Sequence, residues 1–366
     1  MKLAIVADWL TVFGGAEHAI AEFHELWPKA PLFTTVARPE KLGPLAHADI
    51  RTTTLQRFYN IVKKHQALLL LMPRAVESMD LRGFDTILSS SHAVAKGIIP
   101  PHGSVHICYC HTPMRYAWEM EDEYLDDFRV PKLLRKAIKT RLKKLRRWDM
   151  TTAKRVDMFI ANSSETQKRI QNVYARDSII IPPPAADRLF QTPLIPAGER
   201  SYFLAIGRLV PYKRFDLLIE AANALRFPLR IAGTGQEEAR LKHMAGPTVE
   251  FLGFVPDAEL PQLYGGAKAL LFPQYEDAGI VPLEAQACGT PVIAYARGGA
   301  LDSVKNGVTG VFFTEQTPAS ISSAIQEFNT IRTDPQTIRA HAEQFSATRF
   351  RERMQAAVED ARKTYL

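Results

Sequence analysis

Short apolar runs alternate with longer stretches of helical spacing along almost the whole chain of 366 residues. The runs are rich in Ile, Leu and Val, which is typical of strands buried on both faces of a parallel sheet. Strands that alternate with helices predict an α/β fold in which helices cover both sides of such a sheet. In the first half of the chain the predicted strands are residues 3–7, 31–36, 85–90, 105–110, 157–162 and 178–182.

The alternation stops once, at a stretch that contains five prolines between positions 182 and 196. Proline removes a backbone donor and disfavours helix in the residue before it, so the stretch predicts a linker. Six more strands are then predicted at residues 202–207, 229–233, 249–253, 269–273, 291–295 and 310–313. We therefore expect an N-terminal Rossmann-like domain, a linker, a C-terminal Rossmann-like domain and a final helix that could pack back on the first domain. Their expected bounds are 1–182, 183–198, 199–345 and 346–366.

No segment predicts a membrane span or a secretory leader. The longest apolar run, residues 67–72, is far short of the roughly 20 residues that cross a bilayer. The N-terminus has one basic residue and reaches Asp8 after a short apolar run, which favours a buried strand over a leader. The only cysteines, Cys108, Cys110 and Cys288, predict neither a disulfide framework nor a metal knuckle. We expect a cytoplasmic protein.

The formal net charge of +7 is compatible with three kinds of partner. These are nucleic acid, an anionic membrane surface and phosphorylated small molecules. Because the sequence contains no RNP, KH or zinc-finger pattern, it argues against nucleic acid.

The loops after the predicted strands are the expected binding positions, because ligands of doubly wound sheets bind beyond the carboxyl ends of the strands. Gly14 and Gly15 follow the first strand and precede a helix. A glycine pair there lets backbone approach an anion, although it also suits a tight turn without a ligand. After the first strand of the second domain, Arg208 and Lys213 could clamp a diphosphate or remain solvated charges.

Two further loops of the second domain carry weaker signals. Gly233 ends a predicted strand and precedes a helix, so it offers another close backbone approach. Asp257 lies near the start of a helix, where it could contact a ligand or cap the helix.

Two glutamates, Glu276 and Glu284, stand eight positions apart with Gly279 and Pro282 between them. Glycine and proline exclude one continuous helix, but Pro282 suits the first turn of a helix, and we expect Glu284 to lie in that same first turn. The helix dipole alone could account for Glu284. If both carboxylates face one cleft, each could accept a pair of sugar hydroxyls beside the free amides of the loop. Those amides belong to Asp277, Ala278, Gly279 and Ile280.

The run "EDAGIVPLEAQACGTPVI" resembles the E-x7-E motif of retaining GT-B glycosyltransferases of glycosyltransferase family 4. "FGGAEHAI" is similar to the N-terminal glycine loop of that family, "GRLVPYKRFDLLIEA" to its phosphate-binding segment and "NGVTGVFF" to a late loop and strand. "SSSHAVAKG" and "CYCHTPMRYAWEM" resemble the branch that builds bacterial surface polysaccharides, often from GDP-mannose. The resemblance covers nearly the whole chain and implies two doubly wound Rossmann-like domains that face a central cleft.

The resemblance also implies roles for the residues of the matching motifs. Gly14 and Gly15 would approach the donor diphosphate, and Arg208 and Lys213 would neutralise it. Such cations take the place of a metal ion in these enzymes, and no D-x-D spacing is present, so we expect neither a metal nor another cofactor.

The two sugars of the donor would be held by different glutamates under the same resemblance. Glu284 would hold the ribose and Glu276 the hydroxyls of the transferred sugar. His111 would lie beside that sugar on the acceptor side, although it could also be a packed histidine at the end of a strand.

The resulting hypothesis is a retaining hexosyltransferase that moves mannose from GDP-mannose to a saccharide or lipid-linked saccharide. A UDP-sugar donor is the nearer alternative. A basic nucleic-acid-binding protein or a catalytically inactive sugar-binding relative are alternatives of another class.

Residues 131–150 hold nine Lys or Arg between Lys132 and Arg147, with no acid before Asp149. Leucine, isoleucine and tryptophan recur there every three or four positions, which predicts a helix with one apolar stripe and a strongly basic surface. A solvated basic face is one explanation. The other is peripheral, salt-sensitive association of residues 132–147 with an anionic membrane.

Overall fold

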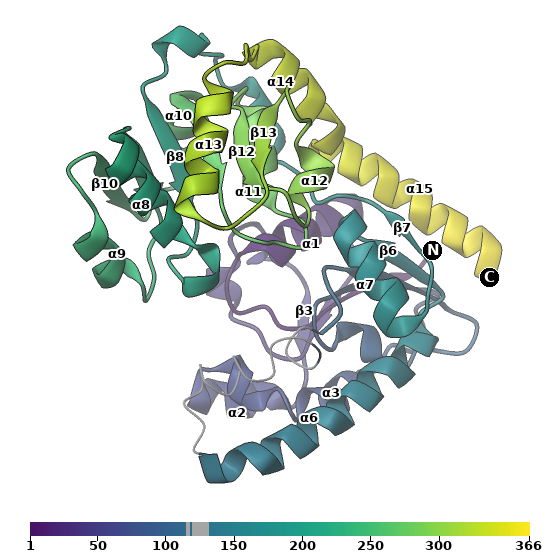
Figure 1. The fold of residues 1–366 in the computed structure, drawn as a ribbon. Helices are drawn as coiled ribbons and strands as arrows, with labels where there is room; N and C mark the ends of the chain where they lie inside the picture. Colours follow the sequence, from purple (N-terminus) through teal and green to yellow (C-terminus); the bar gives the residue numbers. More distant parts are fainter. Residues whose placement is uncertain (115–117, 119–131) are drawn as a thin grey trace. The chain divides into compact units, whose positions relative to one another are not determined.

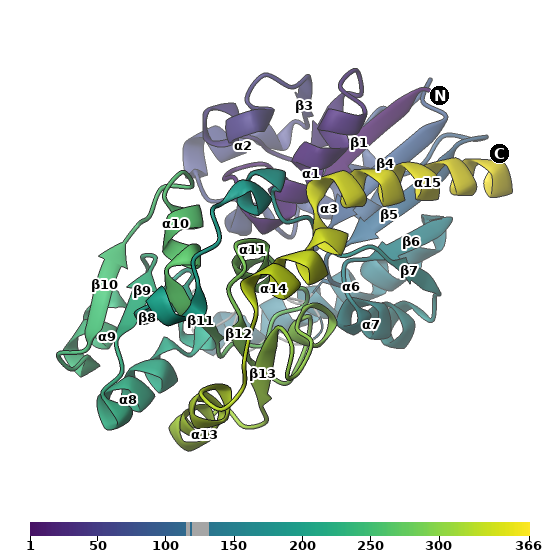
Figure 2. The ribbon, with the colours of Figure 1, turned by 90° about the horizontal axis from the view of Figure 1, so that it is seen from above.

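The computed structural model describes residues 1–114, 118 and 132–366, and the side chains of residues 132–134 and 136–138 are not considered. The chain folds as two compact units. Unit 1 contains Met1–Pro183 and Phe350–Leu366, and unit 2 contains Pro184–Arg349. Figures 1 and 2 show that each unit is a sheet with helices on both faces.

Unit 1 is built on a seven-stranded parallel sheet in the order β3-β2-β1-β4-β5-β6-β7. The six strands predicted in the first half are confirmed, and their ends differ by at most two residues. The structure adds β3, which the sequence did not predict because Ile50 is half-buried and its neighbours are exposed polar residues. The strands are β1 Leu3–Ala7, β2 Leu32–Thr34, β3 Ile50–Thr52, β4 Thr86–Ser91, β5 Val105–Cys110, β6 Met158–Ala161 and β7 Ser178–Ile180.

The helices of unit 1 form two layers. One core cluster joins the sheet to α1 and α15, with Phe23 packed against Phe350. The opposite cluster joins the sheet to α2, α3 and α6, and it includes Tyr59, Met72 and Leu142. The helices are α1 Gly15–Leu26, α2 Leu55–Val62, α3 Met72–Glu77, α6 Lys132–Thr152, α7 Ser164–Tyr174 and α15 Ala347–Tyr365.

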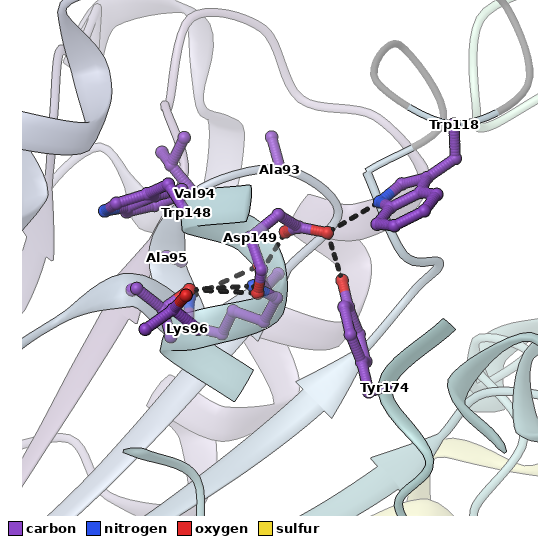
Figure 3. A network of polar contacts seen from close by, with 12 residues as sticks. Ala93, Val94, Ala95, Lys96, Trp118, Trp148, Asp149 and Tyr174 are labelled. Atoms are coloured by element: carbon purple, nitrogen blue, oxygen red, sulfur yellow. Dashed lines mark hydrogen bonds and ion pairs between the residues drawn. The ribbon is translucent and has the colours of Figure 1, made fainter. Parts of the chain in front are cut away.

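A buried ion pair fastens α6 to the loop that follows β4 (Figure 3). Lys96 is 2% exposed, and its Nζ lies 2.7 Å from Oδ1 of Asp149, whose side chain is fully buried. Oδ2 of Asp149 accepts hydrogen bonds from the indole of Trp118 at 2.8 Å and the hydroxyl of Tyr174 at 2.9 Å. Each carboxylate oxygen therefore has a partner, which a buried charge requires.

Unit 2 is built on a six-stranded parallel sheet in the order β10-β9-β8-β11-β12-β13. All six strands predicted in the second half are confirmed. In unit 2 the order reverses between β8 and β11, and in unit 1 between β1 and β4, which makes both sheets doubly wound. The strands are β8 Tyr202–Ile206, β9 Leu229–Ala232, β10 Val249–Gly253, β11 Ala267–Phe272, β12 Val292–Tyr295 and β13 Gly310–Phe313.

Two core clusters cover the faces of this second sheet. One contains α8, α9 and α13, and the other contains α10, α11 and α12. The helices of unit 2 are α8 Phe215–Leu225, α9 Glu238–Met244, α10 Leu260–Gly265, α11 Ile280–Ala287, α12 Ala300–Ser303, α13 Pro318–Phe328 and α14 Pro335–Ala342.

The proline-rich stretch expected as a linker is mostly a packed part of unit 2. Leu189 is 1% exposed and belongs to the core under α11. Ala185 bridges Ser346 in parallel, so both chain crossings lie beside each other, at 183–184 and 349–350. The prolines prevent regular structure here, but the apolar residues between them are buried all the same.

The C-terminal helix α15 packs on unit 1, which is the arrangement that the sequence left open. Phe350 and Met354 enter the same core cluster as α1. Arg351 pairs with Glu22 of α1, and Arg362 pairs with Asp85 before β4. Among the helices of the described residues, none is both long and apolar enough to cross a membrane.

Candidate functional site

The loop after β8 places Arg208 and Lys213 at the carboxyl edge of the unit 2 sheet. Gly207 and Gly233 lie against each other, and a Cβ on Gly233 would collide with the carbonyl of Gly207. Gly233 therefore has a structural reason to be glycine, because it lets the loops after β8 and β9 pack together. The Arg208 side chain is exposed and makes no hydrogen bond or ion pair with any described residue.

Lys213 and Glu276 form an ion pair across two loops of unit 2. Lys213 ends the turn before α8, whereas Glu276 lies in the loop between β11 and α11. Their side chains are 12% and 23% exposed, so the pair is open to solvent on one side. The structure thus brings together the residue expected at the diphosphate and the residue expected at the transferred sugar.

Two glycines, Gly298 and Gly299, pack closely against the backbone of the loop from Glu276 to Gly279. A Cβ on Gly298 would collide with the carbonyl of Glu276, and one on Gly299 with the carbonyl of Ala278. The Gly299 N–H donates to the Glu276 carbonyl at 3.0 Å. The close approach fixes the path of the loop, including Asp277, without using its side chains.

The helix α11 begins at Ile280, earlier than Pro282 suggested. Gly279 is its N-cap at φ +73°, a left-handed conformation that favours glycine, and no side chain caps the helix. Glu284 is consequently the fifth residue of the helix, so its predicted place in the first turn is wrong. The uncapped first turn still directs backbone amides toward the loop.

Glu284 is held by Tyr264 of α10. The tyrosine hydroxyl donates to Oε2 of Glu284 at 2.7 Å. Burial raises the pKa of Glu284 to about 7, although the hydrogen bond from Tyr264 opposes the shift. One carboxylate oxygen is therefore oriented by the protein, and the group titrates near neutral pH.

Asp257 is not the N-cap of α10, which is Glu259. Its carboxylate lies 3.5 Å from a guanidinium nitrogen of Arg188, and its carbonyl accepts a 2.7 Å hydrogen bond from the same side chain. Asp257 also contributes to the raised pKa of Glu284, and Arg188 opposes it. Asp257 and Arg188 thus belong to the electrostatic surroundings of Glu284.

In unit 1, Gly14 caps α1 at the carboxyl end of β1. Its N–H donates to Oε2 of Glu17 at 3.1 Å, so the amide expected to meet a diphosphate is bonded to a carboxylate of its own helix. Gly15 is the first residue of α1. Burial raises the pKa of Glu17, and the charge of His92 partly opposes this.

Asp8, directly after β1, organises the loop after β4. Its carboxylate accepts four backbone N–H bonds, from residues 92 to 95, at 2.5–3.1 Å. Oδ2 also lies 2.9 Å from Nδ1 of His92. Burial lowers the pKa of His92, but the charge of Asp8, the hydrogen bond with Asp8 and the charge of Glu17 together outweigh burial, and the net shift is upward. The Asp8 side chain is fully buried and that of His92 is 24% exposed, and the two form an ion pair when His92 is protonated.

Two other histidines surround this pair. Nε2 of His111, at the end of β5, lies 2.7 Å from the hydroxyl of Ser90, and its ring is 6.2 Å from that of His92. Burial lowers the pKa of His111 to about 3. His65 stacks on Trp9, and burial lowers its pKa to about 4. The pKa of His92 is thus shifted upward, whereas the pKa values of His65 and His111 are shifted downward.

In the described part of the chain no three His, Cys, Asp or Glu side chains are grouped as metal ligands would be. The residues singled out from the sequence fall into two sets. Arg208, Lys213, Gly233, Asp257, the loop 276–280 and Glu284 lie in unit 2, and Gly14, Gly15 and His111 lie in unit 1.

The sequence reasoning missed several residues of these surroundings. Asp8 and His92 each follow a predicted strand, so the rule that led to Arg208 could have found them. Glu17 lies three residues beyond Gly14, the spacing of a carboxylate that bonds back to a helix N-terminus. Tyr264 gives no signal, because it is twenty positions from Glu284 and meets it only through folding.

Comparison with known proteins finds similar sequences for part of the chain and similar folds for nearly all of it. Residues 189–345 match the family described as Glycosyl transferases group 1. A D-inositol 3-phosphate glycosyltransferase of Geodermatophilus obscurus is 33% identical over 201 residues. That match covers 46% of this chain and 45% of the relative, so the chain spans about half the length of the curated relatives it matches.

Solved structures resemble the chain over nearly its full length. HepE of Anabaena, solved with UDP, has a TM-score of 0.71 at 18% identity and covers 98% of this chain and 100% of its own. Sucrose-phosphate synthase of Thermosynechococcus elongatus has a TM-score of 0.70 at 18% identity and covers 98% of each chain. The predicted class of fold is confirmed: the chain has the α/β GT-B fold. The match to the glycosyltransferase group 1 family lies in residues 189–345, which belong to unit 2.

Proposed function

We propose that the protein is a retaining hexosyltransferase that uses a nucleoside-diphosphate sugar. One observation carries the proposal: a unit that matches the glycosyltransferase group 1 family has Arg208, Lys213 and Glu276 on loops at one edge of its sheet, and the oriented Glu284 on α11, the helix that follows the loop of Glu276. Two cations and two carboxylates suit the diphosphate and the two sugars of such a donor.

Each of these groups has a proposed role in the reaction. Transfer breaks the bond between C1 of the sugar and the phosphate oxygen, which builds negative charge on the departing diphosphate. Arg208 and Lys213 stabilise that charge, and the uncapped amides of the loop 277–280 assist them. Glu276 accepts hydrogen bonds from the hydroxyls of the transferred sugar, and Glu284 accepts hydrogen bonds from those of the ribose.

The Lys213–Glu276 pair prepares the site before the donor arrives. Each partner holds the side chain of the other in place, so little reorganisation is needed when a phosphate replaces Glu276 beside Lys213. The leaving phosphate takes the proton of the acceptor hydroxyl, which then forms the new bond on the same face of the sugar.

Unit 1 supplies the acceptor side in this proposal. Neutral His111 offers a hydrogen bond to the sugar, and Gly14 and Gly15 approach the diphosphate once Glu17 releases the Gly14 amide. Gly233 and Asp257 border the nucleotide.

The donor we propose is GDP-mannose, on the basis of the surface-polysaccharide segments. The structures of HepE with UDP and with UDP-glucose favour a UDP-sugar as the second candidate. Calorimetric titration of GDP and UDP into the protein separates the two, followed by donor hydrolysis with GDP-mannose and UDP-glucose. Tighter binding of UDP and hydrolysis of UDP-glucose alone would exclude the GDP-mannose proposal.

No metal or other cofactor takes part in the proposed reaction. Transfer should proceed at the same rate in excess EDTA. Loss of transfer in EDTA and its recovery with Mg²⁺ or Mn²⁺ would contradict the roles given to Arg208 and Lys213.

The acceptor we propose is a saccharide or lipid-linked saccharide used in polysaccharide synthesis. A cytoplasmic enzyme with a lipid-linked acceptor must reach a membrane surface. The exposed cations of α6, among them Lys143, Lys144 and Arg147, would attract an anionic leaflet by about 1 kcal/mol per basic residue. Co-sedimentation with anionic and neutral vesicles at low and high salt tests this part. Binding that ignores lipid charge and salt would reject it.

A further inference from the structure

A short helix of unit 1, α2, presents large apolar side chains to solvent. Phe58, Ile61 and Val62 are 57%, 80% and 46% exposed. Their spacing places them on one face of the helix. Leu55 and Tyr59, at 7% and 4% exposed, hold the adjacent face to the core. One apolar side of α2 is therefore packed in unit 1, and the other, called here the α2 face (Phe58, Ile61 and Val62), is largely exposed and belongs to no core cluster of the described residues.

The segment after α2 adds to the exposed apolar surface. The turn His65–Leu68 packs against α2, and Leu70 and Leu71 directly after it are 39% and 49% exposed. Single exposed apolar residues are ordinary on a protein surface, but five within fourteen positions are not. Such a group marks a surface that another apolar phase covers.

Cations border the apolar residues, and no acid is near them in the sequence. Arg57, Lys63, Lys64 and Arg74 are exposed, and the chain has no Asp or Glu from residue 50 to residue 76. Lys63 and Lys64 immediately follow Val62 at the end of the helix. Glu40 lines a surface pocket together with Lys63, but its carboxylate pairs with Arg38 and leaves the four cations in excess at the rim of the α2 face.

The same layer of unit 1 carries the basic helix α6 (Figure 1). Glu77 at the end of α3 accepts a hydrogen bond from the Trp148 indole at 2.9 Å and pairs with Arg155 at 2.8 Å. With the Lys96–Asp149 pair, these contacts fix α6 to the layer that holds α2 and α3. The exposed apolar residues of α2 and the basic helix α6 thus belong to one packed layer of unit 1.

Two occupants could cover an apolar face of this kind. In a symmetric dimer the same patch meets itself, so the basic rims of two copies would face each other and repel. An anionic bilayer offers apolar chains to Phe58, Ile61 and Val62 and negative headgroups to the cations around them. Charge complementarity therefore favours the bilayer.

We propose that the α2 face inserts into the interfacial layer of an anionic membrane. Arg57, Lys63 and Lys64 lie at headgroup level, and the cations of α6 supply longer-range attraction. The inference rests on the proposed function for the reason why the protein would bind a membrane, since a lipid-linked acceptor lies there. It extends that function by naming a contact that is apolar and distinct from α6.

The first test measures partition of the full chain onto vesicles of equal parts phosphatidylglycerol and phosphatidylcholine. Phe58→Ser with Ile61→Ser should lower the partition coefficient roughly tenfold or more, because two large apolar side chains no longer leave water. The matched control is Ile179→Ser, which alters a side chain 43% exposed on the edge strand β7 of the same unit. It should bind like the wild type.

The second test reports where α2 lies. All three native cysteines are buried, so Ile61→Cys can carry one environment-sensitive dye. On vesicles its emission should shift to the blue and be quenched by nitroxide lipids. A dye at Asn60→Cys, on the exposed polar side of the same helix, should respond much less.

The outcomes separate this inference from the proposed function. Equal vesicle binding by the wild type and the serine variant, or equal dye responses at positions 60 and 61, would overturn insertion. A wild-type dimer that becomes a monomer in the serine variant, by ultracentrifugation without lipid, would overturn it in favour of a second copy. Sugar transfer to a water-soluble acceptor should be the same in wild type and serine variant. If no donor supports sugar transfer but the α2 face still inserts, the proposed function is wrong and the membrane inference is retained.

Discussion

The two units share one architecture but use the charged groups near their sheets differently. In unit 1, Asp8 is bonded to four backbone amides and His92, and the Lys96–Asp149 pair is almost completely buried. In unit 2, Arg208 is exposed and the Lys213–Glu276 pair is open to solvent on one side.

This difference separates charges that hold the fold from charges that are available to a ligand. A buried charge whose hydrogen-bonding capacity is filled by the protein has little left to offer a substrate, and its loss destabilises the fold. A charge on an edge loop contributes little to stability, because water screens it. Unit 1 should therefore respond to substitution mainly in stability, and unit 2 mainly in binding and turnover.

The largest effect is expected at Lys96. Lys96→Met leaves Asp149 buried without its cation and should lower the free energy of unfolding of unit 1 by about 3 to 5 kcal/mol. Urea unfolding followed by tryptophan fluorescence measures this, since Trp118 and Trp148 both lie beside the pair.

A double variant tests the cause of that loss. Lys96→Met with Asp149→Leu removes both charges and should be more stable than Lys96→Met alone. If Lys96→Met alone lowers the free energy of unfolding by less than about 1 kcal/mol, water or another cation reaches Asp149. The proposed contrast between the charged groups of the two units would then be wrong.

Arg208→Ala and Lys213→Ala in unit 2 should lower turnover strongly and change stability little. Each substitution removes a charge-assisted contact to the diphosphate. It should raise the activation free energy by about 1.5 to 3 kcal/mol, which lowers turnover roughly 10- to 150-fold. The free energy of unfolding should change by no more than about 0.5 kcal/mol for the exposed Arg208. Steady-state rates at saturating donor and urea unfolding give the two numbers.

Lys268→Ala is the matched control, because Lys268 is an exposed cation near the opposite, amino end of β11. It should leave turnover unchanged. Turnover near the wild-type value in Arg208→Ala or Lys213→Ala would mean that the edge loops of unit 2 do not hold the diphosphate.

The sequence was sufficient for the fold because its signals are local. Each strand of the described residues except β3 contains at least two adjacent apolar residues, and the proline-rich stretch marks the place where the chain passes from one sheet to the other. The short β3 is amphipathic and lies at a sheet edge, so it has no such run. The packing of residues 184–198 into unit 2 depends on α11 and Phe345, which no local pattern reveals.

The sequence named candidate site residues in the loops after strands, and the resemblance gave them roles, which remain predictions. Arg208 and His111 were found in this way or through the resemblance. The partners that decide protonation were not: Tyr264 reaches Glu284 from a different helix, and Glu17 takes the Gly14 amide. Their effects arise from burial and distance, which exist only in the folded chain.

The two glutamates of unit 2 should differ in what they bind. Glu284→Gln should weaken binding of the bare nucleoside diphosphate several-fold, because its carboxylate receives the ribose. Glu276→Gln should spare that binding or strengthen it slightly, since it frees Lys213 for phosphate, yet it should impair sugar transfer. Calorimetry with the nucleoside diphosphate and transfer rates with the full donor provide the comparison. Equal losses of nucleotide affinity in both variants would contradict the division.

The smallest effect is the pH dependence of nucleotide binding. Burial raises the pKa of Glu284 to about 7, so the carboxylate is mostly protonated at pH 6 and mostly ionised at pH 8. If ribose hydroxyls donate to the ionised form, nucleotide affinity should fall as the pH falls, by roughly tenfold at most between pH 8 and pH 6. The diphosphate titrates in the same range, so Glu284→Gln measured in the same buffers is the control and should show a flatter profile.

Tyr264→Phe sharpens this last test. The hydrogen bond from Tyr264 lowers the pKa of Glu284, so its removal should raise that pKa and move the loss of affinity to higher pH. The variant keeps the ring that fills the core under α11, which limits any structural change. Identical pH profiles for wild type, Glu284→Gln and Tyr264→Phe would mean that Glu284 does not contact the nucleotide and is a buried structural carboxylate, like those of unit 1.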